Sequence, residues 1–242
     1  MNSRLHIYTW QVNKGAKGPQ DNAYFEFDES EFRRKISSVR KGQFFTAHLI
    51  WDPGITKVCQ SEGIPVVHLI RDPRDVLVSR LHYAKGLKRT RLNRTLMERY
   101  PDDETRLRAL ITGDETNEAK GYINLASMAH SWSRFQGWLS DPNSMVVRFE
   151  DLVGSAGGGS DNKRAETITA VLQHVGLSYR PEIVNKMMQR SSGKGSLTFR
   201  RGKVGAWQDE IPVGAQHTLA ECMGQQLEQM GYREAIPGDV SH

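Results

Sequence analysis

Residues 64–79 read IPVVHLIRDPRDVLVS, and this stretch decides the fold. A short apolar run rich in Val and Ile stops abruptly at Arg71-Asp72-Pro73, and an amphipathic pattern begins at once. Such a run is typical of a buried parallel strand that leads directly into a helix. In open α/β sheets, ligands bind outside the carboxyl ends of the strands, so this junction is the first place to expect a site.

Helix initiation explains only part of this junction. Asp72 is a good N-cap, Pro73 suits the first helical position, and Asp75 at the third position completes a variant of the capping box. Arg71, however, is a cation at the positive end of the helix dipole, and Ser79 is a modest helix former two turns further on. A bound anion would compensate for the placement of Arg71, which makes Arg71 and Ser79 candidates for an anion site.

Segment 70–79, IRDPRDVLVS, resembles the 3′-phosphate-binding segment of the sulfotransferases that use 3′-phosphoadenosine 5′-phosphosulfate (PAPS). In that family an arginine and a serine eight residues later hold the 3′-phosphate of the nucleotide. The resemblance therefore assigns this contact to Arg71 and Ser79. It also implies an α/β fold with three layers, in which a mainly parallel sheet is flanked by helices, as in the P-loop nucleotide kinases.

A second segment, SLTFRRGKVGAW at 196–207, is similar to the late Phe-x-Arg-Lys-Gly-x-x-Gly-x-Trp element of the same family. In the family this basic glycine loop closes over the 3′-phosphate, so Arg200, Arg201 and Gly202 are the implied contacts. Arg201 stands where the family usually has lysine, a tolerable change for a contact made largely by charge. Taken alone, the segment would be interpreted as a solvated basic loop.

A third segment, SMVVRFEDL at 144–152, resembles the family's strand that ends in Tyr-Glu-Asp-Leu. The tyrosine of that motif lies near the adenine, and Phe149 occupies its position here. Phenylalanine keeps a stacking face but lacks the hydroxyl donor, so the resemblance implies stacking on the base without a polar contact. By itself the segment predicts only a buried strand that runs into a loop.

The candidate for chemistry is His48, which ends the short predicted strand QFFTAHL at 43–49. In the resembling family a histidine at the end of such a strand is the general base that takes the hydroxyl proton of the acceptor. An imidazole that titrates near neutral pH is well matched to this task. The alternative is a surface or hydrogen-bonded core histidine, because the chain has eight histidines.

The chain departs from the family in one respect. The family's early Pro-Lys-Ser-Gly-Thr-Thr-Trp loop, which cradles the 5′-phosphosulfate, has no counterpart in this sequence. Lys14 and Lys17 lie in a possible loop but lack neighbouring Ser or Thr residues in the required pattern, and they lie too close to His48. The resemblance covers roughly residues 40–210, and we expect an N-terminally incomplete domain with an open apolar groove beside the 64–70 strand.

Composition agrees with this interpretation without deciding it. A chain of 242 residues predicts one α/β domain over 1–242. Cys59 and Cys222 lie far apart and show no metal-ligand spacing, which favours a reducing compartment and a cytoplasmic location. The sequence predicts neither a membrane span nor a signal peptide. A net charge of +5 suits an anionic cofactor, although it would also suit nucleic acid or an anionic membrane.

Periodicity predicts the remaining organisation. Residues 95–120 carry many charges and little apolar periodicity, which suggests either a lid near an acceptor pocket or a solvated helical insertion. Residues 154–160 predict a flexible loop. Helices are predicted over residues 28–39, 53–62, 73–85, 125–139, 163–175, 181–190 and 215–230.

Two hypotheses about function follow. The first is a sulfotransferase that moves a sulfonyl group from PAPS to a hydroxyl or amine on a small-molecule, lipid or carbohydrate acceptor, with no metal required by the family's chemistry. The second is a catalytically impaired relative or fragment that binds only the nucleotide or another anionic partner. Nucleic acid is not expected as a partner, because basic residues interleaved with exposed aromatics and known reader motifs are missing from the sequence. The sequence leaves the acceptor and the oligomeric state open.

Overall fold

The computed structural model of the protein describes residues 7–9, 28–40, 42–115, 120–190 and 202–232. The strands are β1 (Ile7–Thr9), β2 (Phe44–Thr46), β3 (Val66–Ile70) and β4 (Ser144–Arg148). The helices are α1 (Glu29–Ile36), α2 (Pro53–Ser61), α3 (Pro73–Gly86), α4 (Arg91–Arg99), α5 (Asp103–Thr112), α6 (Met128–Ser133), α7 (Asp161–His174), α8 (Pro181–Arg190), α9 (Trp207–Glu210) and α10 (Val213–Gln229). The described residues also contain the short 3-10 helices η2 (Gln136–Leu139), η3 (Phe149–Asp151) and η4 (Ser155–Gly157).

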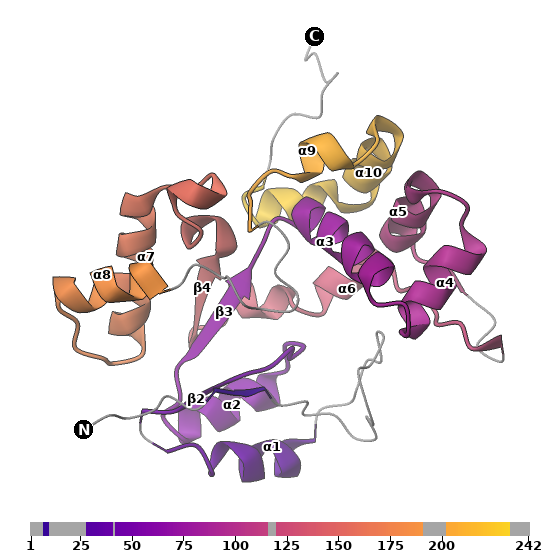
Figure 1. Cartoon of the computed structure of the whole chain (residues 1–242). Helices are drawn as coiled ribbons and strands as arrows, with labels where there is room; N and C mark the ends of the chain where they lie inside the picture. The colour runs from indigo at the N-terminus through magenta and orange to yellow at the C-terminus, as the bar shows by residue number, and fades with distance from the viewer. Residues whose placement is uncertain (1–6, 10–27, 41, 116–119, 191–201, 233–242) are drawn as a thin grey trace.

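The predicted α/β class with parallel strands and flanking helices is confirmed. β1 pairs with β2, and β3 pairs with β4, in both cases in parallel. Within the described residues the strands form two separate two-stranded sheets. Figure 1 shows the β3–β4 pair in the middle of the molecule, with α7 and α8 on one side and α3, α4 and α5 on the other. Parallel pairing requires long crossovers, and helices lie within them here, as in the passage from β1 through α1 to β2.

One face of β3 corrects the prediction of a buried strand. Val67 and Leu69 are 39% and 55% exposed, whereas Ile70 on the opposite face is buried. Side chains alternate between the two faces of a strand, and the described residues cover only one of them. Phe44 of β2 is exposed as well. These exposed side chains agree with the open apolar surface predicted beside this strand.

The main core lies among α3, α4, α5, α6 and α10, and it corrects the interpretation of residues 95–120. Leu96 of α4 and Leu107, Leu110 and Ile111 of α5 are fully buried. α5 packs against both α3 and α10, so its described residues are neither a lid nor a solvated insertion. A helix needs an apolar side chain only every third or fourth residue to face a core, and the many charges of this segment concealed that pattern.

A second core lies among α1, α2 and η2, and Figure 1 shows α1 and α2 below β3 and β4. Its buried residues are Phe32, Ile36, Ile55, Val58, Cys59 and Trp138. Trp138 comes from η2, because the helix predicted over 125–139 is divided into α6 and η2. The indole of Trp138 donates to the carbonyl of Leu49, which fixes the chain just after His48.

The segment predicted as a flexible loop at 154–160 is a hydrogen-bonded turn that contains η4. Gly157 is buried, and its carbonyl accepts from the backbone N–H of Val204 at 2.9 Å. A Cβ atom at position 157 would lie 2.6 Å from the carbonyl oxygen of Gly202. The glycines therefore permit close backbone packing at this position.

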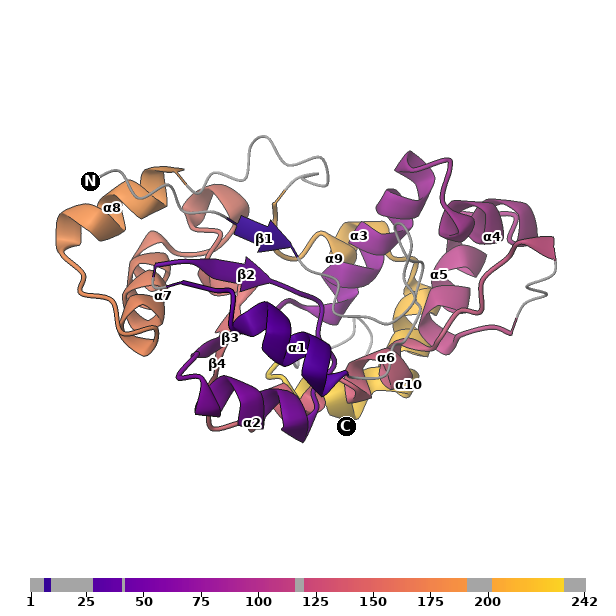
Figure 2. The same ribbon diagram turned by 90° about the horizontal axis from the view of Figure 1, so that it is seen from below.

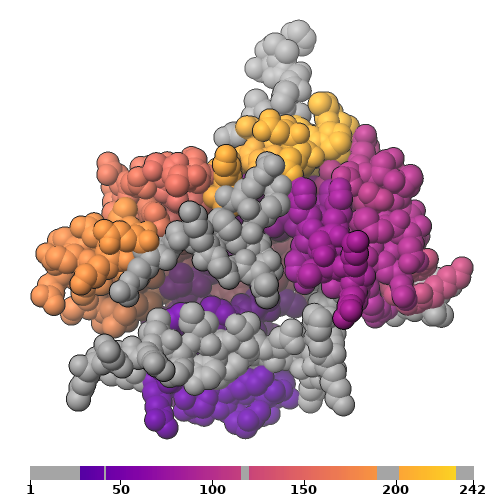
Figure 3. All heavy atoms as spheres, viewed as in Figure 1, coloured from indigo at the N-terminus to yellow at the C-terminus, as the bar shows by residue number. Residues whose placement is uncertain are grey.

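Figure 2, seen from below, separates α7 and α8 from the α3–α6 group, and the space-filling view in Figure 3 shows the same two masses with α9 and α10 above them. In the described part of the chain, every helix is too short or too polar to cross a bilayer.

Candidate functional site

The site begins where β3 ends and α3 starts. The Asp72 carboxylate accepts from the backbone N–H of Arg74 at 2.9 Å, so Asp72 caps α3 as predicted. The backbone N–H of Asp72 itself donates to Glu150 of η3 at 2.9 Å. The junction is thereby fixed to the end of β4, the neighbouring strand, and Arg71 lies between the two strand ends.

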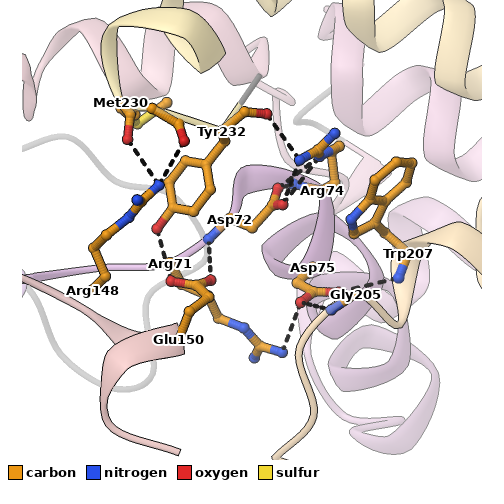
Figure 4. Close-up of polar contacts among 11 residues, drawn as sticks. Arg71, Asp72, Arg74, Asp75, Arg148, Glu150, Gly205, Trp207, Met230 and Tyr232 are labelled. Atoms are coloured by element: carbon orange, nitrogen blue, oxygen red, sulfur yellow. Dashed lines mark hydrogen bonds and ion pairs between the residues drawn. The ribbon is translucent and has the colours of Figure 1, made fainter. Parts of the chain in front are cut away.

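Asp75 does not complete a capping box, which corrects the sequence-based interpretation. Its Oδ2 accepts from the backbone N–H of Gly205 at 2.9 Å, and its Oδ1 accepts from that of Trp207 at 3.1 Å. Figure 4 shows the carboxylate turned away from its own helix, toward the segment that contains Gly205 and Trp207. Burial raises the pKa of Asp75, while the two N–H donors and the Arg71 guanidinium act in the opposite direction.

Arg71 makes contacts with three parts of the chain. Its Nη2 donates to the carbonyl of Lys203 at 2.9 Å and lies 3.6 Å from Oδ2 of Asp75. The guanidinium also lies 4.4 Å from the ring centroid of Phe149. The structure therefore brings together two predicted residues, Arg71 and Phe149, and joins them to the described part of the glycine loop.

Ser79 lies on the same face of α3 as Asp75, because residues four positions apart in a helix are neighbours on one face. Its side chain is half-buried, and its hydroxyl makes no hydrogen bond with the described residues. One turn further, Nε2 of His82 lies 2.6 Å from Glu210 of α9. The face of α3 that carries Ser79 is therefore the face that meets the 202–210 segment.

The basic glycine loop is described only in part. Gly202 is half-buried with a φ of +58°, a left-handed conformation that favours glycine, and it lies against Gly157. Arg200 and Arg201 lie outside the described residues, as do Lys14 and Lys17. Their proposed contacts stay predictions.

A buried network that the sequence did not reveal supports this site (Figure 4). The guanidinium of Arg74 donates to Asp72 at 2.7 Å and to the carbonyl of Tyr232 at 3.0 Å, and it lies 4.0 Å from the Trp207 ring centroid. The Tyr232 hydroxyl donates to Glu150 at 2.9 Å. The only hint in the sequence was an Arg and an Asp two residues apart at a helix start, which also suits an exposed pair.

Additional support comes from Arg148 at the end of β4. Its Nη2 donates to the carbonyls of Met230 and Gly231 at the end of α10. Cations near the last carbonyls of a helix are stabilising, because those groups lack partners within the helix. The strand end beneath Phe149 is thus tied to the end of α10.

His48 is placed differently. It follows β2 by two residues, and its side chain is exposed. It makes no hydrogen bond or ion pair with the described residues, and no described contact brings it to Arg71 or Ser79. The structure therefore leaves the role of His48 as a prediction.

No described group of three or more His, Cys, Asp or Glu side chains could hold a metal ion. The described surface has a shallow apolar hollow between η2 and α10, lined by residues that include Trp132, Phe135 and Met230. None of Arg71, Ser79 and Phe149 lines it. The structure instead places the Arg71 guanidinium against a glycine-containing loop at the β3–α3 junction, with the Ser79 hydroxyl on the helix that follows, and groups of these kinds often bind anions.

Comparisons with known proteins concern the family and the fold of the chain. A family model described as "Sulfotransferase domain" matches residues 7–231. Among curated proteins, none matches the chain significantly.

Several solved structures share the fold. The mouse sulfotransferase SULT7A1 complexed with PAP has a TM-score of 0.54 and 15% identity, over 88% of this chain and 74% of that one. Retinol dehydratase in complex with androsterone and the inactive cofactor PAP has a TM-score of 0.54 and 17% identity, over 83% of this chain. This chain spans 58% of the length of retinol dehydratase. At such low identity the likeness shows the fold alone.

Proposed function

Because the chain belongs to the sulfotransferase domain family, we propose that it binds PAPS and transfers the sulfonyl group to a hydroxyl or amine of an acceptor. The observation that carries the proposal is the contact between Arg71 and the carbonyl of Lys203, 132 residues apart in sequence. Both segments were assigned to the 3′-phosphate by resemblance, and the half-buried Ser79 lies two turns into the helix that follows Arg71. A guanidinium offers several N–H donors in a plane, which suits a phosphate.

In this proposal the residues have distinct roles. Arg71, Ser79 and the loop that contains Arg200, Arg201 and Gly202 bind the 3′-phosphate, and Phe149 lies against the adenine. His48 takes the proton of the acceptor as the sulfonyl group moves from the 5′-phosphate oxygen to the acceptor oxygen or nitrogen. The step resembles in-line phosphoryl transfer, in which positioning and charge neutralisation supply most of the rate. No metal is included in this proposal.

The acceptor is proposed only by class: a small molecule, a lipid or a carbohydrate that carries a hydroxyl or amine. The cytoplasm is the proposed location. It is supported by Cys59 and Cys222, both of which are free thiols.

Nucleotide binding tests the proposal directly. 3′,5′-Diphosphoadenosine should raise the melting temperature of the protein more than 5′-AMP does at the same concentration, because only the former carries the 3′-phosphate. Arg71→Ala should remove most of that difference, since a charge-assisted contact contributes about 1.5–3 kcal/mol. Arg34→Ala is the matched control, because the Arg34 side chain is 74% exposed on α1. Equal shifts with both nucleotides in the unaltered protein would overturn the proposal.

A second candidate function is nucleotide binding without turnover. Two observations favour it: the sequence has no Pro-Lys-Ser-Gly-Thr-Thr-Trp loop, and the described structure leaves His48 exposed. Loss of one preorganised donor to a developing negative charge typically costs about 10²–10³ in rate, and here the whole loop is missing from the sequence. Transfer of labelled sulfonate from PAPS to a panel of phenol, sterol and sugar acceptors separates the two candidates. Robust transfer would exclude the second one.

A further inference from the structure

Asp75 contacts two parts of the proposed nucleotide site, the glycine loop and Arg71. Its side chain is fully buried, and each carboxylate oxygen accepts a backbone N–H from the glycine loop, one from Gly205 and one from Trp207. The same carboxylate lies 3.6 Å from the guanidinium of Arg71. No other described side chain contacts both Arg71 and the backbone N–H groups of this loop.

We propose that Asp75 is a positioning residue of the nucleotide site, which holds Arg71 and the loop 202–207 in the arrangement that receives the 3′-phosphate. The inference rests on the proposed function. Asp75 would not touch the nucleotide itself, because its side chain is fully buried beneath the loop. It acts through Arg71 and through the loop backbone.

The local geometry distinguishes this role from ordinary helix capping. Asp75 lies in the first turn of α3, where a carboxylate usually binds the N–H groups of its own helix. Here both oxygens are used by a segment 130 residues away. Gly205 has a φ of +76°, a left-handed conformation that favours glycine and that accompanies the donation of its N–H to the carboxylate.

The loop is also held from its other side. The N–H of Val204 donates to the carbonyl of Gly157, and the backbone of Gly202 approaches Gly157 so closely that a Cβ there would lie 2.6 Å from the Gly202 oxygen. The loop is therefore clamped between Asp75 on α3 and Gly157 on the η4 turn. Of these two contacts, only that with Asp75 carries charge and reaches Arg71.

The charge of Asp75 allows a test, because simple repulsion and a positioning role predict opposite changes in nucleotide affinity when that charge is removed. A carboxylate near a phosphate repels it, so removal of the charge would strengthen nucleotide binding if Asp75 did nothing else. If Asp75 positions Arg71 and the loop, the same change weakens binding. Asp75→Asn keeps the shape of the side chain but replaces one of the two acceptor oxygens by a donor, which cannot bind a backbone N–H.

The experiment compares the affinities of Asp75→Asn and the unaltered protein for 3′,5′-diphosphoadenosine and for 5′-AMP by calorimetry. We expect about tenfold or greater loss of affinity for 3′,5′-diphosphoadenosine, and less than about threefold for 5′-AMP. Asp141→Asn is the matched control, because Asp141 is also buried and accepts from Trp51, Thr56 and Asn143. That variant should lose stability while the ratio of the two affinities stays unchanged. Unchanged or tighter binding of 3′,5′-diphosphoadenosine by Asp75→Asn would overturn the inference.

Hydrogen exchange supplies a readout that needs no nucleotide. The amides of Gly205 and Trp207 should lose protection in Asp75→Asn but not in Asp141→Asn, and retained protection would contradict the inference. If the unaltered protein does not prefer 3′,5′-diphosphoadenosine, the proposed function and the role of Asp75 in it both fail, whereas hydrogen exchange still shows whether Asp75 holds the loop.

A second variant covers the case in which Asp75→Asn does not fold. Gly157→Ala would place a Cβ 2.6 Å from the Gly202 carbonyl oxygen and 2.7 Å from the Cβ of Val153, so we expect it to shift the contact between the loop and the η4 turn while the charge beside Arg71 stays unchanged. It should lower the affinity for 3′,5′-diphosphoadenosine more than that for 5′-AMP. Equal loss with both nucleotides would show that the position of the loop does not control 3′-phosphate binding, and would overturn the inference.

Discussion

The end of β3 and the end of β2 carry the two halves of the predicted site, and they are built very differently. At the end of β3, Arg71, Asp72, Arg74 and Asp75 each have hydrogen-bonded or ionic partners from distant segments. At the end of β2, His48 is exposed and has no such partner among the described residues. A preorganised site loses less entropy when its ligand binds. The difference teaches that the fold itself supports the proposed nucleotide site, whereas the proposed chemistry rests on a residue without hydrogen-bonded or ionic partners among the described residues.

The largest expected effect concerns His48, at the end of β2. His48→Asn should lower sulfonate transfer by about 10²–10⁴, the usual range for loss of a general base. It should leave the affinity for 3′,5′-diphosphoadenosine nearly unchanged, because His48 lies outside the β3–α3 network. Single-turnover transfer with enzyme in excess measures the first quantity, and calorimetry measures the second. Normal turnover by the variant would remove His48 from the mechanism, and failure to fold would assign it a structural role.

The next largest effect concerns the hydrogen-bonded network at the end of β3. Arg74→Met should lower the free energy of unfolding by about 3–5 kcal/mol, because it leaves the Asp72 carboxylate buried without its charged partner. The two side chains are each 8% exposed. Urea denaturation measures the change. Arg33→Met is the control, since the Arg33–Glu29 pair is 43% and 54% exposed and such pairs contribute little.

A double variant, Arg74→Met with Asp72→Asn, checks the cause. Without the unpaired charge, it should be more stable than Arg74→Met alone. Equal stability of the single and double variants would mean that the contacts of Arg74 with Tyr232 and Trp207, rather than its pairing with Asp72, hold the junction.

A smaller effect is expected from the strand beneath the junction. Burial lowers the pKa of His68 to about 4, well below the ordinary value of 6.5. The unfolded chain therefore takes up a proton first, and stability should fall as the pH drops from about 6.5 to about 4, with no effect of this group above that range. We expect a loss of about 1–2 kcal/mol, allowing for partial exposure. His68→Leu should flatten the pH dependence of unfolding in this window, and an unchanged profile would contradict the prediction.

The sequence predicted the elements at the junction well because local chemistry specifies them. The apolar run of β3, the N-cap Asp72 and Pro73 at the first helical position are all signals within a few residues. The resemblance also paired Arg71 with the distant glycine loop, and the contact with Lys203 agrees with that pairing. Asp75 was misread, because a carboxylate in the first turn of a helix has a sufficient local explanation and nothing nearby indicates a partner 130 residues away.

The lack of a local signal for distant partners also explains the incorrect predictions elsewhere in the chain. α4 and α5 contain enough charges to suggest a solvated segment, yet Leu96, Leu107 and Leu110 are fully buried because α3 and α10 lie against them. The turn at 154–160 looked flexible from its glycines, which in fact allow close contact with Gly202. The exposed face of β3 could not be foreseen from the strand alone, since burial depends on which segments cover it. Tertiary partners, rather than local propensity, decided each of these points.

The smallest expected effect concerns the contact between α3 and α9, beside the network at the end of β3. His82 of α3 lies 2.6 Å from Glu210 of α9, one turn beyond Ser79, and their side chains are 39% and 20% exposed. Because solvent screens such a pair, His82→Gln should lower stability by only about 0.2–1 kcal/mol and the affinity for 3′,5′-diphosphoadenosine by less than about threefold. Calorimetry at low and high salt measures both the size of the change and its screening. A loss of affinity as large as that expected for Asp75→Asn would mean that the loop is held mainly through α9. Asp75 would then make the weaker of the two contacts along this face of α3.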